Sequence, residues 1–314
     1  MPSSSFPHFL KDHDVILGEG AVIERLKREC GLELDPHIVN AAYVYEDKKR
    51  AVLERIYREY LDIGMTSGLP MMLSTPTWRA SRERIKLAGH SERAVNADNF
   101  RFLEDLRNSC GDYAGKVVIC GLMSCRGDAY NPADRLSEQA AYGFHSWQAG
   151  KLAETGVDLL MAATLPALSE AIGLAAAQAA TGKPYIISFV LRPQGTLLDD
   201  TPLKDAIATI DAKVDPKPLA YLANCTHASF FRSAITHQHN DTPLVRNRII
   251  GLLANTAALE PEALDDSENL IAENPEAFGN DVARLRDEFG LTILGGCCGT
   301  DERHIGALAQ NLIS

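Results

Sequence analysis

Three cysteines stand where their side chains could act together. Cys297 and Cys298 are adjacent in the segment GGCCG (295–299), and Cys225 follows an asparagine in LANCT (222–226). Each segment ends a short apolar run of the kind that forms a buried parallel strand. Thiolates are strong zinc ligands, and three of them leave one position of a tetrahedral ion open, as in catalytic zinc sites. The spacing therefore predicts a zinc site held by these three residues.

Other interpretations of the cysteine pair stay open from the residues alone. Adjacent cysteines could form a strained vicinal disulfide, and glycines after a strand could bind phosphate. The zinc hypothesis also uses the glycines, because Gly295, Gly296 and Gly299 would let the backbone turn sharply enough for both thiols to reach one ion. A lone cysteine in an apolar strand, such as Cys120, is predicted to be a small hydrophobic residue. The remaining cysteines are also predicted to be structural: Cys30, Cys110 and Cys125.

The elements that must position these cysteines are eight apolar runs separated by amphipathic stretches. Near-continuous apolar strands that alternate with helices indicate a parallel sheet covered on both faces. The pattern predicts a (β/α)8 TIM barrel formed by residues 1–314 as a single domain, with an open doubly wound sheet as the alternative. No Gly-x-Gly-x-x-Gly motif follows the first run, so a dinucleotide site has no support. The predicted strands are 14–20, 68–75, 116–124, 158–164, 184–190, 219–226, 248–256 and 291–296.

In this barrel the cysteines end the sixth and eighth strands. One strand separates the two, and the carboxyl ends of barrel strands all meet at the face where active sites form. Two polar segments are predicted to lie outside the site: the His-Gln-His of 237–239 as a solvated loop, and the acidic stretch 258–281 as a surface loop. His227, two residues after Cys225, is predicted not to be a ligand.

Composition restricts the class of protein. The formal net charge is −11 and the isoelectric point about 5.3, which argues against nucleic acid or anionic membranes as partners. The first residues lack the features of a signal peptide, and no apolar run has transmembrane length. We expect a cytoplasmic protein with small-molecule partners, in a reducing compartment where cysteines bind metals or act in catalysis more often than they form disulfides.

Several motifs together resemble the zinc-dependent homocysteine S-methyltransferase family. The Asn-Cys of the sixth strand and the GGCCGT of the eighth are the specific part. Weaker likeness extends over nearly the whole chain, through ILGEGAVIERL, LSTPTWRAS, HSWQAGKLAETGVDLL and TGKPYIISF. The resemblance implies a TIM barrel, zinc held by Cys225, Cys297 and Cys298, and an enzyme that forms methionine from homocysteine.

The implied reaction is methyl transfer to a metal-bound thiol. A free thiol with a pKa of about 8.5 is mostly protonated at neutral pH, and zinc deprotonates it. The thiolate then attacks a methyl group on a cationic sulfonium or quaternary ammonium donor. A cationic donor favours an aromatic wall, for which the candidates are Trp78, Tyr130, Phe144 and Trp147.

The chain departs from the family pattern at the expected substrate contacts. Where the family has a Glu-Thr pair after the fourth strand, with the glutamate binding the homocysteine amino group, this chain has Ala163 and Thr164. Glu19 replaces the aspartate after the first strand, and Asn255 lies in LANTAA (253–258), which replaces the family's segment after the seventh strand. We predict Glu19, Thr164, Trp78 and Asn255 as substrate-binding residues.

These departures leave two functions to distinguish. The first is a zinc-dependent S-methyltransferase that acts on homocysteine or another small thiol, with Glu19 as the substitute anchor. The second is a family member that acts on a different thiol or only binds zinc and thiols. A zinc hydrolase is disfavoured, because three thiolates suit a soft thiol ligand better than an activated water.

Overall fold

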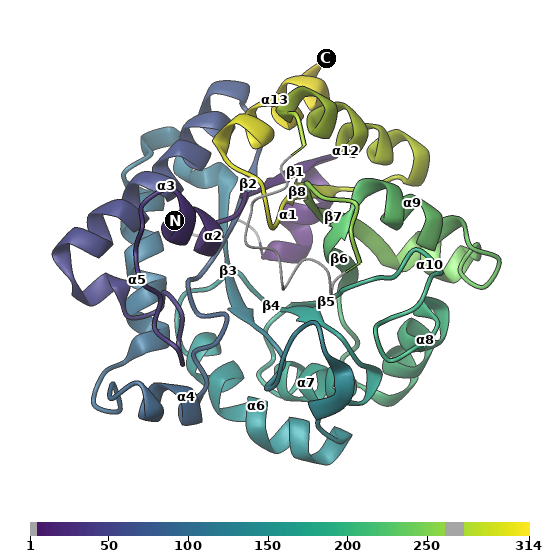
Figure 1. Cartoon of the computed structure of the whole chain (residues 1–314), viewed down its shortest axis with the longest axis horizontal. Coiled ribbons are helices and arrows are strands. Elements are labelled where there is room, and N and C mark those ends of the chain that lie inside the picture. The colour runs from purple at the N-terminus through teal and green to yellow at the C-terminus, as the bar shows by residue number, and fades with distance from the viewer. Residues whose placement is uncertain (1–4, 261–272) are drawn as a thin grey trace.

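The computed structural model describes residues 5–260 and 273–314, which form a closed barrel of eight parallel strands in the order β1 to β8 (Figure 1). The TIM barrel prediction is confirmed, and the doubly wound alternative is wrong because β8 pairs with β1. All eight strands fall within or at the edges of the predicted runs. They are β1 Ile16–Gly18, β2 Met71–Ser74, β3 Val117–Met123, β4 Leu159–Leu165, β5 Tyr185–Phe189, β6 Ala220–His227, β7 Ile249–Asn255 and β8 Ile293–Gly296.

Helices surround the barrel, and one helix lies inside its ring (Figure 1). The outer helices bury one apolar face against the strands, as the amphipathic stretches predict. The inner one is α1, whose Phe6 and Phe9 pack against the apolar side chains inside the barrel, such as Met72 and Leu222. The α-helices are α1 Phe6–Asp12, α2 Ile23–Arg28, α3 Asp47–Ser67, α4 Arg82–Leu87, α5 Val95–Asn108, α6 Glu138–Ala153, α7 Leu168–Ala179, α8 Leu203–Lys213, α9 Ala228–Thr236, α10 Pro243–Arg248, α12 Pro275–Phe289 and α13 Glu302–Ile313.

One predicted boundary needs correction. The sequence predicts a surface loop over residues 258–281, but α12 already begins at Pro275. Asn274 accepts hydrogen bonds from the backbone N–H groups of Glu276 and Ala277, and proline occupies the first turn, where its missing N–H costs nothing. Residues 261–272 of that stretch lie outside the described part of the chain.

Two strands change register where they reach the barrel mouth. The pairing of β4 shifts between Ala162 and Leu165, and the pairing of β6 shifts between Asn224 and Thr226. Thr164 and Cys225 lie between the residues where the pairing shifts, and their φ angles are positive, at 60° and 50°. Side-chain-bearing residues rarely adopt this conformation, and it persists where surrounding contacts enforce it, as at functional sites.

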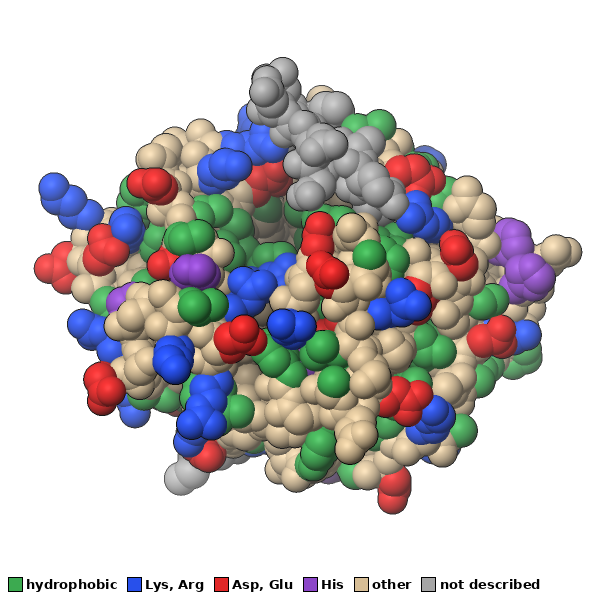
Figure 2. Space-filling model, turned by 60° about the horizontal axis from the view of Figure 1, so that its bottom comes forward, with side chains coloured by type: hydrophobic (Ala, Val, Ile, Leu, Met, Phe, Trp, Pro, Cys, Tyr) green, Lys and Arg blue, Asp and Glu red, His purple; other side chains and the backbone are tan. Residues whose placement is uncertain are grey.

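The surface carries charges of both signs. Figure 2 shows basic and acidic side chains interspersed on one face, around a hollow where hydrophobic side chains gather. Among the described residues, no helix is long and apolar enough to cross a bilayer.

Candidate metal and substrate site

The structure brings the three predicted cysteines together. The sulfur atoms of Cys225, Cys297 and Cys298 all lie within 4.8 Å of one another. Sulfurs around a tetrahedral zinc ion would be about 3.8 Å apart, given Zn–S bonds of about 2.3 Å. Only β7 separates β6 from β8, so the ends of these two strands meet as expected. The arrangement fits a three-thiolate metal site, and the structure contains no cysteine pair in a disulfide among its described residues.

Asn224 fixes the position of Cys225. Its Nδ2 donates to Thr164 Oγ1 at 2.7 Å and to Cys225 Sγ at 3.4 Å. Its Oδ1 accepts from Thr164 N at 2.8 Å and from Ser188 Oγ at 2.7 Å. One buried amide therefore ties the end of β4 to the end of β6, and it holds both residues with positive φ. Asn224 belonged to the Asn-Cys motif, but the sequence did not reveal this role.

The three glycines of the second segment act differently from one another. Gly299 has a φ of +84° and turns the chain after the cysteine pair, as predicted. Gly295 and Gly296 belong to β8, so they do not make the turn. Gly295 is needed for close approach, because an added Cβ would lie 2.7 Å from Gly18 Cα of the neighbouring strand.

Hydrogen bonds and charge near the sulfurs tune the site. The thiols of Cys297 and Cys298 donate to Cys225, which lowers the pKa of Cys225 well below its usual range. Tyr130 Oη lies 3.7 Å from Cys298 Sγ. Burial holds the pKa of Tyr130 well above its usual range, so the phenol stays protonated and can donate.

Glu24, on α2, contacts the residue that follows the cysteine pair in the chain. It accepts a hydrogen bond from Gly299 N and pairs with Arg28 at 3.1 Å. Burial and then the nearby Cys298 raise the pKa of Glu24.

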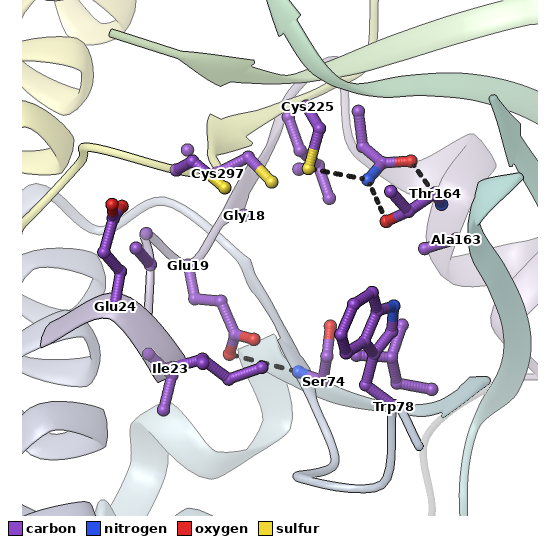
Figure 3. A pocket seen from close by; sticks show the side chains of 18 of the residues that line it. Gly18, Glu19, Ile23, Glu24, Ser74, Trp78, Ala163, Thr164, Cys225 and Cys297 are labelled. Carbon is purple, nitrogen blue, oxygen red and sulfur yellow. Dashed lines mark hydrogen bonds between the residues drawn. The ribbon is translucent and has the colours of Figure 1, made fainter. Parts of the chain in front are cut away.

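A cavity of about 420 Å³ opens beside the cysteines. All four predicted substrate-binding residues line it: Glu19, Trp78, Thr164 and Asn255. Figure 3 shows Glu19, Trp78 and Ala163 on different sides of this space, with Cys225 and Cys297 at another side. Of the proposed aromatic wall, Trp78 and Tyr130 line the cavity, whereas Phe144 and Trp147 do not. Trp147 instead packs against the separate cluster that contains Ile38 and Val95, so its assignment to the donor wall is wrong.

Glu19 faces an apolar environment. Its Oε2 accepts a hydrogen bond from Ser74 N at 3.1 Å, and Met72, Met161 and Ala163 also line the cavity. Burial raises the pKa of Glu19 to about 8, although the hydrogen bond from Ser74 opposes the shift. The carboxyl group is therefore mostly neutral at pH 7 in the free protein, and a cationic ligand group would favour its ionisation.

The raised pKa of Glu19 predicts a pH-dependent stability. Between the ordinary carboxyl pKa of 4.5 and about 8, the folded protein keeps a proton that the unfolded chain releases, so stability falls as pH rises through this window. Glu19→Gln cannot ionise, so its stability relative to the parent should increase from pH 4.5 to pH 8 by about 1–3 kcal/mol. Urea unfolding at both pH values measures this, with Glu92→Gln on the surface as the control. Parallel pH profiles for Glu19→Gln and the parent would contradict the shift.

Asn255 offers an unused amide. Its side chain is 1% exposed, it lines the cavity, and neither Nδ2 nor Oδ1 has a hydrogen-bond partner within the described residues. A buried amide without partners is costly unless a ligand or water satisfies it. Thr164 differs, because Asn224 already binds its hydroxyl.

The remaining histidines and cysteines that the sequence singled out lie outside the three-sulfur cluster. His227 caps α9, and its Nε2 lies 3.4 Å from Glu273 Oε2. His237 and His239 have rings 4.9 Å apart, and the metal-ligand groupings found in the described part of the chain do not include them. Cys120 and Cys125 are buried, while Cys30 and Cys110 are half-buried, and none of the four belongs to the three-sulfur cluster.

Comparison with known proteins assigns the chain to a family. The family model described as Homocysteine S-methyltransferase matches residues 16–312. A homocysteine S-methyltransferase of Escherichia coli is 26% identical over 95% of this chain and 96% of the relative. Betaine--homocysteine S-methyltransferase 1 of Bos taurus is 23% identical over 96% of this chain and 73% of the relative.

Solved structures share the fold. The metallated form of the homocysteine methyltransferase MmuM from Escherichia coli superposes with a TM-score of 0.73, at 21% identity over 96% of this chain and 98% of that one. The family match, together with the barrel and the cysteine cluster at its mouth, confirms the resemblance found in the sequence: this chain belongs to the homocysteine S-methyltransferase family.

Proposed function

We propose that the protein is a zinc-dependent S-methyltransferase that moves a methyl group from a sulfonium or quaternary ammonium donor to a thiol such as homocysteine. The observation that carries the proposal is the cluster of three cysteine sulfurs within 4.8 Å, facing a cavity of about 420 Å³. This volume is that of a small-molecule site.

Cys225, Cys297 and Cys298 would hold the zinc ion. The donor set is all sulfur, and soft thiolate ligands favour zinc over magnesium or calcium. A zinc ion held by these residues would lower the pKa of an acceptor thiol, so that the thiol is deprotonated at neutral pH. Asn224 and Tyr130 hold or contact the sulfurs through the hydrogen bonds described above, so the chain orients the ligands before substrate arrives.

The remaining cavity residues would orient the two substrates. Glu19 and Asn255 present the polar groups that could bind an amino-acid head, since Glu19 attracts an ammonium group and the Asn255 amide can both donate and accept. Trp78 and Tyr130 offer ring faces to a cationic methyl donor. Alignment of the thiol and the methyl group in this cavity would promote the transfer without a covalent enzyme intermediate.

A second candidate is favoured by Ala163. This residue lines the cavity at the place where the resemblance implies a glutamate, and its neighbours Met161 and Leu122 are apolar. An acceptor thiol without an amino group would fit such a wall, so the alternative is an S-methyltransferase for a different thiol, or a protein that binds zinc and thiols without methyl transfer.

A substrate screen tests the function. The purified protein should bind about one zinc ion per chain and should consume thiol in the presence of one of three donors: S-methylmethionine, betaine or S-adenosylmethionine. Removal of the metal with a chelator should abolish turnover while the circular dichroism spectrum stays unchanged, because a barrel with a large core does not need the ion to fold. Bound zinc without methyl transfer to any thiol tested would favour the non-catalytic alternative.

A further inference from the structure

The loop that connects β3 to α6 contributes a side chain to the candidate metal site, although the three cysteines all lie at the ends of β6 and β8. Residues 126–136 leave the barrel after Cys125 and carry Tyr130, whose hydroxyl lies 3.7 Å from Cys298 Sγ. The segment contains one short 3-10 turn, Pro132–Asp134, and otherwise has no regular structure to hold it. Contacts from other elements must therefore hold it. Tyr130 packs against Val190 and Leu198, and Arg79 donates to the carbonyl groups of residues 125–127. A further set of contacts lies at the two ends of the segment.

A single buried carboxylate binds both ends. Glu170, in the first turn of α7, is 1% exposed. Its Oε1 accepts from Arg126 N at 2.6 Å, and its Oε2 accepts from Leu136 N at 3.3 Å. The neighbouring Ser169 Oγ donates to Leu136 O at 2.8 Å. The start and the end of the segment are thus fixed to one turn of one helix.

His145 on α6 completes this arrangement. Its Nε2 donates to Glu170 Oε1 at 2.9 Å, and both side chains are 1% exposed. Burial opposes ionisation of Glu170, but the hydrogen bonds from His145 and from the backbone keep the pKa of this carboxyl below its usual value. A buried carboxylate that accepts three hydrogen bonds is a strong and directional fixing point.

Glu170 does not line the substrate cavity, so it cannot touch the reacting atoms there. Its hydrogen-bond partners all belong to the segment or to the helix that follows it. The contacts of this carboxylate thus fix the segment that carries Tyr130 and the helix that follows it.

We propose that Glu170, supported by His145, is a positioning residue of the metal site: it fixes residues 126–136 so that the Tyr130 hydroxyl donates to the sulfur of Cys298. Hydrogen bonds from outside the ligand sphere orient metal ligands, and their removal typically weakens metal binding about 10- to 100-fold. The inference deepens the proposed function, since the affected property is retention of the metal.

The test compares Glu170→Gln, Tyr130→Phe, the double variant and the parent in their rate of metal release to a chelator. Glutamine keeps the size of the side chain but replaces one acceptor oxygen with an NH2 group, so one end of the segment loses its partner. Each single variant should release the metal about tenfold faster than the parent. The double variant should be no faster than either single one, because Glu170 acts through Tyr130. Effects that multiply in the double variant, or an unchanged rate in Glu170→Gln, would overturn the proposal.

Amide hydrogen exchange gives a second readout without reference to activity. Exchange at the backbone amide that loses its acceptor, Arg126 or Leu136, should accelerate in Glu170→Gln and stay unchanged in Tyr130→Phe. Glu138→Gln, an exposed residue of the adjacent helix that pairs with Lys213, is the matched control and should change neither readout. If Glu170→Gln folds poorly, Ser169→Ala tests the same connection more gently, with faster exchange at Leu136 and about threefold faster release expected. No change in either would also overturn the proposal.

The outcome is separable from that of the proposed function. If the parent binds no metal, the proposed function fails, but the alkylation rate of Cys298 in the same four proteins still reports the contact with Tyr130. The same pattern is then expected, with equal acceleration in both single variants and no further gain in the double variant.

Discussion

Cys298→Ala is expected to release the metal and to lower methyl transfer by at least about 100-fold. Loss of a hydrogen bond to a ligand already weakens metal binding about 10- to 100-fold, and loss of the ligand itself removes one of three protein bonds to the ion. The cluster gives the reason: Cys225 and Cys297 alone cannot hold an ion with one position still open for the thiol. Elemental analysis of protein purified under reducing conditions, together with an activity assay, measures both effects.

Cys110→Ala is the matched control. Cys110 is half-buried and lies outside the three-sulfur cluster, where its thiol donates to Leu106 O at 3.4 Å. This variant should keep its metal and activity. The circular dichroism spectrum of Cys298→Ala should match that of the parent, because the barrel core does not include the site. Full activity of metal-free Cys298→Ala would refute the zinc proposal.

Glu19→Gln is expected to weaken binding of homocysteine about 10- to 100-fold and to leave binding of 4-mercaptobutyrate unchanged. A hydrogen bond between charged groups contributes about 1.5–3 kcal/mol, and each 1.4 kcal/mol is tenfold in affinity. The two thiols differ by the amino group, so their affinity ratio isolates the contact with Glu19. Spectroscopy of the cobalt-substituted protein measures both affinities.

The pH dependence of that ratio identifies the group. Because the pKa of Glu19 is raised to about 8, binding an ammonium group below that pH requires the carboxyl to lose its proton. Preference for homocysteine over 4-mercaptobutyrate should therefore rise up to about tenfold per pH unit between pH 6 and 8 and then level off. The proton lost by the thiol itself is common to both ligands and cancels in the ratio. In Glu19→Gln the ratio should not change with pH.

Ala163→Glu in the Glu19→Gln background provides the complementary test. It places a carboxylate on the opposite side of the cavity mouth, at the end of β4, and should restore part of the preference for homocysteine. If the parent binds both thiols equally at every pH, Glu19 is not the anchor, and an acceptor without an amino group becomes the better proposal.

The sequence by itself determined the barrel and the cysteines of the site. Runs of apolar residues long enough for buried strands, separated by amphipathic helices, are local patterns, and they located all eight strands. The closeness of the cysteine motifs at the ends of the sixth and eighth runs then follows from the topology, since the carboxyl ends of all strands in a parallel barrel meet at one face. The first helix was missed because seven residues with two phenylalanines have no distinctive period, and its role as a plug depends on the barrel that it closes.

Only the tertiary structure decided how the site is held. Asn224 joins β4 to β6, and Glu170 fixes the segment that carries Tyr130, through contacts between residues that are 60 and 34–44 positions apart in the chain. The pKa of Glu19 depends on burial, which no single position reveals. Phe144 and Trp147 fitted a donor wall by residue type, but the orientation of α6 directs them elsewhere. Residue type and strand order are properties of the sequence, whereas burial and the partners of polar groups exist only once the loops have packed over the strand ends.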